Sequence, residues 1–422
     1  MYCNIPLQAL PIGARLVSSI YDERRTKLLA AGMEITEQLL LTLRNRTIDS
    51  VVVGRQDLGR ILAFKPQGKA NVAPGERRNI TTNIENPISR ELDSQLGSCS
   101  QPGITASLRP FAAVLRPTEL GSYDRDLMNF MAERREYNVD RLHQLGEACA
   151  TGNPIDLELT FDVVRDQLRT ATEDVDAFSC LGTTPFMHPY PTRHVLHTAM
   201  IATSIGIALG LDERNLEELG TGCLIHDLGM LGVDRMTVGA KTFLEPTEFA
   251  EIVKHPIRTF EMIERHIDLV PVGARMVAYQ MHERCNGSGY PRGRTKAQIH
   301  PLARIAAVAD SFSALVCARP HRPGMQPYFA MEKLVKDVSR GLFDPQAVRG
   351  LLQAVSLFPV GSYVEMSNGY VGRVIRANAH DYMRPVVEVW SRDRIGGAPA
   401  VVDLAQESKL AIRRTLDAPH SN

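Results

Sequence analysis

The sequence predicts a mainly α-helical protein, with a small mixed α/β domain before the helical core and a small β domain after it. Three observations support this. Apolar residues recur at helical spacing between about residues 124 and 355, alternate with polar residues from 358 onward, and form short runs between turns over residues 1–64. With 422 residues, 44% of them hydrophobic, the chain is long enough for two or three domains.

The N-terminal part of the chain divides into a small domain, a linker and a helical segment. Within residues 1–64, short apolar runs predict strands, and one stretch predicts a helix: the strands at 14–17, 27–30 and 50–53, the helix at 36–46. Residues 65–108 are rich in Pro, Gly, Asn, Ser and Arg and predict a flexible linker. Within residues 109–179, apolar residues at helical spacing predict amphipathic helices over 124–150 and 155–178.

The central block, residues 180–356, predicts an all-helical core. The expected helices cover 194–209, 212–225, 246–266, 272–282, 302–318, 328–340 and 345–355. Residues 357–422 change to a period of two and predict a small β domain and tail, with strands at 362–366, 372–375 and 386–390.

The composition limits the classes of partner. Lysine plus arginine (48) equals aspartate plus glutamate (48), so the chain lacks the broad basic field that non-specific binding to nucleic acid needs. The seven scattered cysteines, without a C-x-x-C pair, are typical of reduced thiols. No secretory signal is recognisable, and the longest apolar stretch, about 198–211, is too short for a membrane span. We therefore expect a cytoplasmic protein without a polymeric nucleic-acid partner.

Side chains able to bind a metal recur through the predicted core. They are His194, His226, Asp227, His255, His282 and Asp310. Imidazoles and carboxylates without thiolates suit iron, manganese or zinc in a hydrolytic site better than structural zinc. A hydrolytic metal pair needs a bridging carboxylate, which Asp227, directly after His226, can supply. A single histidine is ordinarily a core or surface residue, but this set in this order favours a metal centre.

Two motifs resemble a known family. His226-Asp227, followed by Leu228-Gly229, and the later segment 286–291, Asn-Gly-Ser-Gly-Tyr-Pro, are similar to the HD-GYP domain, a subgroup of the HD phosphohydrolase superfamily. The segments 254–256, 306–310, 318–322 and 341–345 match supporting positions of that family. The resemblance extends from near residue 180 to 356, and the combined motifs are specific.

The resemblance implies a metal-dependent phosphodiesterase of bacterial second-messenger signalling, which converts cyclic di-GMP to linear pGpG and then GMP. It implies a binuclear divalent centre, with iron or manganese expected and zinc or nickel as alternatives. One metal would be held by His194, His226, Asp227 and Asp310, and the second by Asp227, His255 and His282, with His226 and Asp227 as the catalytic pair. The substrate would be bound by Gly289, Tyr290, Pro291, Arg319 and Arg322, the arginines through its phosphates.

Four positions depart from the family's pattern. Met230 stands where active members commonly carry lysine, and Met281 where many carry a further histidine, so we expect weaker substrate electrostatics and a second metal short of one imidazole. Tyr190 replaces the glutamate of three-metal members, and Thr259 replaces a common glycine as a packing difference. Glu283 is a weak candidate for a metal ligand or for an outer support of one, although local pairing is its more ordinary role. Together these departures predict reduced activity.

Two alternatives stay open. A degenerate second metal site would turn the domain into a regulatory module that binds nucleotide or a partner protein, such as a GGDEF-type cyclase. The second alternative is hydrolysis of another phosphorylated nucleotide, which the Gly-Tyr-Pro segment disfavours. By analogy with the family, the helical segments 124–150 and 155–178 could pair two copies into a homodimer.

Overall fold

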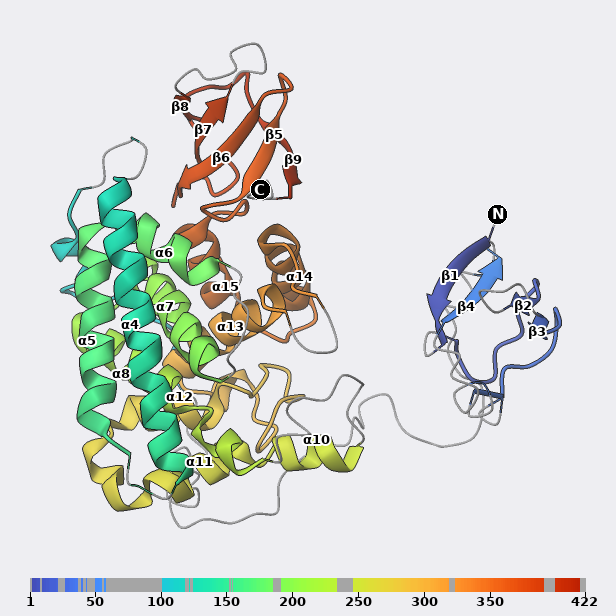
Figure 1. Cartoon of the computed structure of the whole chain (residues 1–422), viewed down its shortest axis with the longest axis horizontal. Coiled ribbons are helices and arrows are strands. Elements are labelled where there is room, and N and C mark those ends of the chain that lie inside the picture. The colour runs from blue at the N-terminus through green and yellow to red at the C-terminus, as the bar shows by residue number, and fades with distance from the viewer. Residues whose placement is uncertain are drawn as a thin grey trace. The chain divides into compact units, whose positions relative to one another are not determined.

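The structure is a computed structural model, in which the chain divides into two compact units, Met1–Glu76 and Arg77–Asn422. Both are drawn in Figure 1. The residues that the structure describes are 2–7, 10–21, 27–36, 39–40, 43, 50–54, 57, 101–117, 121, 124–151, 153, 155–184, 191–233, 246–318, 323–390 and 399–417.

The first unit contains a small antiparallel sheet. Its strands are β1 (Tyr2–Pro6), β2 (Ile20–Tyr21), β3 (Lys27–Leu29) and β4 (Ser50–Gly54), in the order β1-β4-β2-β3. The predicted strands at 27–30 and 50–53 are present as β3 and β4. Residues 14–17 form no strand and contribute only an isolated bridge between Arg15 and Glu34, and β1 was not predicted. The predicted helix at 36–46 lies largely outside the described residues.

Helices make up most of the second unit. The α-helices are α4 (Arg125–Ala150), α5 (Leu157–Glu173), α6 (Val175–Thr183), α7 (Thr192–Ala208), α8 (Glu213–Ile225), α10 (Pro246–Ile252), α11 (His255–Ile263), α12 (Val272–Gln280), α13 (Pro301–Val316), α14 (Pro327–Ser339) and α15 (Pro345–Val355). Short 3-10 helices are η3 (Phe111–Val114), η4 (Leu228–Gly232), η5 (Glu264–Leu269) and η6 (Lys296–Gln298). The predicted helical core is thus confirmed.

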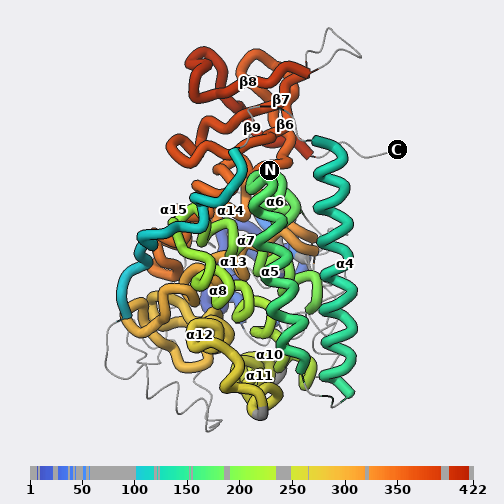
Figure 2. Tube along the Cα trace, turned by 90° about the vertical axis from the view of Figure 1, so that its left-hand side faces the viewer, coloured from blue at the N-terminus to red at the C-terminus, as the bar shows by residue number. Residues whose placement is uncertain are grey.

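The almost wholly buried helix α7 lies at the centre of this unit and packs against α6, α8, α13 and α15. Helices α4 and α5 lie side by side on its outer face, and α10 and α11 lie at the end opposite the C-terminal sheet (Figures 1 and 2). None of the helices in the described part of the chain combines the length and the apolar character needed to cross a membrane.

Two predicted helices are divided in the structure. The segment 155–178 breaks at Asp174, whose extended backbone ends α5 and whose carboxylate caps α6 by accepting hydrogen bonds from the amides of Asp176 and Ala177. The segment 246–266 breaks before His255, because Pro256 has no N–H to continue a helix but fits in a first turn. The second break places His255 at the start of α11.

The end of the predicted linker lies against the helices. Of residues 65–108, only 101–108 fall among the described residues. There the side chain of Ile104 is buried, and the amide of Ser107 donates to the carbonyl of Gly210 at 2.8 Å. Arg304, which pairs with buried Asp344 at 2.9 Å, also donates to the carbonyl of Pro102. By these contacts, residues 101–108 belong with the helical unit.

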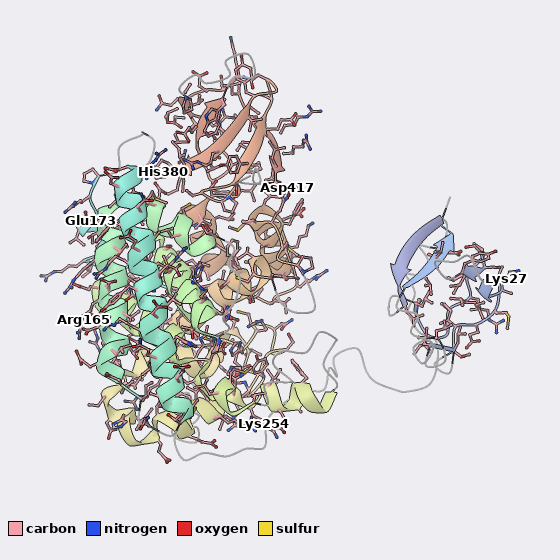
Figure 3. All side chains as sticks on the ribbon, viewed as in Figure 1. Lys27, Arg165, Glu173, Lys254, His380 and Asp417 are labelled. Carbon is pink, nitrogen blue, oxygen red and sulfur yellow. The ribbon has the colours of Figure 1, made fainter. Side chains whose placement is uncertain are left out.

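A five-stranded antiparallel sheet follows the last helix. Its strands are β5 (Tyr363–Met366), β6 (Val371–Arg376), β7 (Val386–Trp390), β8 (Ala400–Asp403) and β9 (Ile412–Leu416), in the order β8-β7-β6-β5-β9. The first three match the predicted strands. A buried ion pair joins the sheet to the helices, because Arg376 on β6 lies 2.6 Å from a carboxylate oxygen of Asp174. Asp174 directly follows Glu173, the last residue of α5, which is labelled in Figure 3.

The same junction makes stability depend on pH. Burial raises the pKa of Asp176 from 3.8 to about 7, although the amide of Ala377 and the charge of Arg376 oppose the shift. The folded chain therefore binds a proton more tightly than the unfolded chain, so this contribution to stability is complete below about pH 4 and is lost as the pH rises through 7. Between pH 6 and 8 the free energy of unfolding should fall by about 1 kcal/mol from this group. Urea unfolding at both values measures it. An Asp176→Asn protein with an unchanged pH dependence would contradict this origin.

Candidate metal centre

The six predicted metal-binding side chains converge in the second unit, although they come from separate elements. His194 lies on α7, His226 and Asp227 follow the end of α8, His255 begins α11, His282 follows α12, and Asp310 lies on α13. All six are buried, with exposed fractions of 8% or less. Because these elements pack directly on one another, the ligands are held by the helical core and not by surface loops.

Short distances join the six side chains into one cluster. His194 Nε2 lies 2.9 Å from one oxygen of Asp310, and His282 Nδ1 lies 3.6 Å from the other. Asp227 Oδ1 lies 3.2 Å from Nε2 of His226 and 3.4 Å from Nε2 of His255. Two groups have ligand atoms within 4.8 Å of one another: His194, His226 and Asp310, and His226, Asp227 and His282. The cluster can therefore hold a metal ion.

The hydrogen bonds of two histidines place a proton on the outer nitrogen of each ring. His226 Nδ1 lies 2.7 Å from the carbonyl oxygen of Cys223, and His255 Nδ1 lies 2.8 Å from that of Ile252. A carbonyl can only accept, so each Nδ1 carries a proton, and in the neutral form of each ring the Nε2 lone pair points inward. These two Nε2 atoms face Asp227, which is also an acceptor, and neither has a hydrogen-bond partner. Acceptors that face one another in a buried site fit a cation between them.

The protonation states of the histidines and aspartates in the cluster also favour metal binding. Burial lowers the pKa of His255 and that of His282, so both rings stay neutral. Burial raises the pKa of Asp227 and Asp310, but as the pH falls the surrounding histidines gain positive charge before these carboxyls are protonated, which holds both carboxyl pKa values below their usual range. Two ionised carboxylates beside neutral imidazoles are the protonation states of metal ligands.

The Gly-Tyr-Pro segment covers one side of the cluster. The ring of Tyr290 stacks on that of His282, with centroids 5.0 Å apart and planes 12° apart. The close approach depends on Gly289, where a Cβ would lie 2.4 Å from the Cα of Glu283. The carboxylate of Glu283 is hydrogen-bonded to backbone amides. Its two carboxylate oxygens accept from the amides of Arg292, at 2.8 Å, and Arg294, at 2.9 Å, and thus anchor the segment after Pro291.

Two cations near His255, Lys254 and Arg258, both pair with the carboxylate of Glu251. Lys254, directly before His255, lies at the end of the unit that carries α10 and α11 (Figure 3). Its ammonium lies 2.5 Å from Glu251, and Arg258 lies 2.7 Å from the same carboxylate.

Met230 and Met281 are buried, and Met281 packs in the main hydrophobic core. Arg319 and Arg322, predicted to bind phosphate, and Tyr190 lie outside the described residues.

Two hydroxyl groups at the cluster were not recognised as functional from the sequence. Ser313 Oγ lies 3.3 Å from Nδ1 of His194, and Thr259 Oγ1 donates to the carbonyl of His226 at 2.9 Å. Their spacing along the helices could have indicated them. Ser313 follows Asp310 by three residues and Thr259 follows His255 by four, so each lies on the same helix face as a candidate ligand. Neither partner residue could be identified from that spacing.

Part of the chain is similar to known proteins. The family model for the HD domain matches residues 181–347. A cyclic di-GMP phosphodiesterase of Pseudomonas aeruginosa is 28% identical over 259 residues, 60% of this chain and 61% of that protein. The 3'3'-cGAMP-specific phosphodiesterase 3 of Vibrio cholerae is 29% identical over 171 residues, 40% of this chain and 36% of that protein. The chain therefore matches less than two thirds of either relative's length.

Among solved structures, an HDG"Y"P protein of Bdellovibrio bacteriovorus aligns with a TM-score of 0.44 and 14% sequence identity, covering 83% of this chain and 98% of that one.

Proposed function

We propose that residues 181–347, which match the HD-domain family model, form an HD domain of the HD-GYP type, and that this chain is a metal-dependent phosphodiesterase that hydrolyses cyclic di-GMP to pGpG and then GMP. One observation carries the proposal. The buried Nε2 atoms of His226, His255 and His282 lack hydrogen-bond partners and lie in a cluster with two carboxylates. Such a donor set suits a divalent cation that acts on a phosphodiester.

The six ligands would hold a pair of cations, with iron or manganese expected because all donors are imidazole nitrogen or carboxylate oxygen. When bound, such cations polarise a phosphoryl oxygen and lower the pKa of water. His194, His226, Asp227 and Asp310 would hold one, and Asp227, His255 and His282 the other. Asp227 would bridge the two, since its Oδ1 already faces the nitrogens of His226 and His255.

The Tyr290 segment would form the substrate side of the centre. Its ring lies over His282, and its centroid is 6.0 Å from that of the His255 ring, so it borders both histidine ligands of the second cation. Glu283 would keep it there through the amides of Arg292 and Arg294. Arg319 and Arg322, which follow α13 in the sequence, are proposed to contact phosphate.

A substrate panel tests this proposal. The relatives named above act on two cyclic dinucleotides, so cyclic di-GMP and 3'3'-cGAMP are compared with pGpG and nucleoside phosphates, each with Mn(II) or Fe(II). We expect cyclic di-GMP to be cleaved fastest and pGpG to appear before GMP. Preferential cleavage of a nucleoside phosphate would overturn the substrate assignment, and preference for cGAMP would reassign it within the cyclic dinucleotides.

One observation favours a second candidate, a regulatory module that binds nucleotide or a partner such as a GGDEF-type cyclase. Buried Met230 and Met281 carry neither charge nor a good ligand for hard cations. Under this alternative, the metal-supplied chain binds cyclic di-GMP stoichiometrically without turnover. Turnover that depends on metal would exclude it.

A further inference from the structure

One hydroxyl group joins the two elements that carry three of the metal-binding residues. Thr259 Oγ1 donates to the carbonyl of His226 at 2.9 Å and accepts from the amide of Gly229 at 3.0 Å. These are backbone groups on either side of Asp227, where α8 has ended and η4 begins. Thr259 is fully buried, so no bulk solvent reaches this point.

The turn after His226 is pressed against α11 at the same place. A Cβ on Gly229 would lie 2.1 Å from the carbonyl oxygen of His255 and 2.8 Å from the amide nitrogen of Thr259. Only glycine fits there. The hydroxyl of Thr259 and the absent side chain of Gly229 therefore set together how closely η4 approaches α11.

That approach determines the spacing of ligands. Thr259 lies one helical turn after His255 on α11, so a shift of the turn relative to Thr259 is also a shift relative to His255. Across this contact, Asp227 Oδ1 and His255 Nε2 lie 3.4 Å apart. A cation that binds both atoms requires this separation to be held within a few tenths of an ångström.

We infer that Thr259 is a positioning residue, whose hydroxyl holds Asp227 against His255 and thereby sets the affinity of the centre for divalent metal. The inference rests on the metal-dependent function proposed above. A hydroxyl is suited to this position because it can donate to a carbonyl and accept from an amide at once. Serine keeps both abilities, whereas valine keeps the shape of threonine and has neither.

The experiment measures Mn(II) affinity and the number of Mn(II) ions bound by the full chain. Thr259→Val should bind Mn(II) about tenfold or more weakly, because supports of metal ligands typically change affinity by that order. Thr259→Ser should stay within about threefold of the unchanged chain. Metal affinity, not activity, is the readout, so a chain that binds Mn(II) but hydrolyses no cyclic dinucleotide still tests the inference.

The matched control is Thr160→Val. Thr160 is also fully buried, on α5, and its hydroxyl donates to the carbonyl of Asp156 at 3.2 Å. This variant loses a buried side-chain hydrogen bond away from the metal ligands, so it should be less stable but should keep its Mn(II) affinity. If Thr259→Val does not fold, Thr259→Ala replaces it. Mn(II) affinity equal to that of the unchanged chain in the folded variant, or an equal loss in Thr160→Val, would overturn the inference.

Discussion

Replacing Asp227 with alanine should abolish phosphodiester hydrolysis while the chain remains folded. Asp227 Oδ1 faces Nε2 of His226 and of His255, and it is the carboxylate that can bridge two cations. Its loss removes several kcal/mol of charge stabilisation, which corresponds to a turnover at least about 10³-fold lower. Turnover of cyclic di-GMP and bound metal per chain are the measurements, with circular dichroism to confirm folding.

The matched control is Asp140→Ala, which removes an exposed carboxylate on α4. That variant should keep both full turnover and full metal content. Full activity in Asp227→Ala would refute the assignment of the centre. An equal loss in Asp140→Ala would show that the effect does not arise at the cluster.

Replacing Gly229 with alanine should lower both the free energy of unfolding and the amount of metal that the chain binds. The added Cβ would lie 2.1 Å from a carbonyl oxygen of α11, where neither backbone can yield without moving Asp227 or His255. Overpacking of this kind costs about 3 kcal/mol, and the displaced ligands should release metal. Urea unfolding and metal analysis measure the two effects.

The control for this variant is Gly146→Ala on α4, where nothing lies within 4 Å of the added Cβ. Because alanine is a better helix former than glycine by about 1 kcal/mol, this variant should be as stable as the unchanged chain or more so. A Gly229→Ala chain that unfolds at the same urea concentration as Gly146→Ala, with its metal retained, would contradict the close packing of η4 on α11.

Periodicity predicted the helices well where one amphipathic pattern formed one element. Helix α15 has the predicted bounds 345–355, and α7 (Thr192–Ala208) differs from its prediction by two residues at its start. The prediction failed where a single polar residue or a proline overrode the pattern, as at Asp174 and before Pro256. Strands β8 and β9 were missed because neither has a fully buried residue, so burial imposes little alternation on them.

The candidate ligands could be named from the sequence because their residue types and order resemble a family's motif. The residues that contact and support these ligands could not be identified from the sequence. The contact of Thr259 with His226 spans 33 residues, and that of Ser313 with His194 spans 119. Such pairs are determined by helix packing, to which no local pattern is sensitive. Glu283 shows the same limit, since its position beside His282 suggested a support for a ligand, whereas its carboxylate binds the amides of the Tyr290 segment.

The most direct measurement of the central claim is the conversion of cyclic di-GMP by the full chain as its metal content is varied. The chain is stripped with a chelator and then supplied with increasing Mn(II) or Fe(II), and pGpG is quantified against bound metal. We expect no pGpG from the stripped chain and a rate that rises with the metal bound. Equal turnover with and without metal, or no turnover by a fully loaded chain, would contradict it.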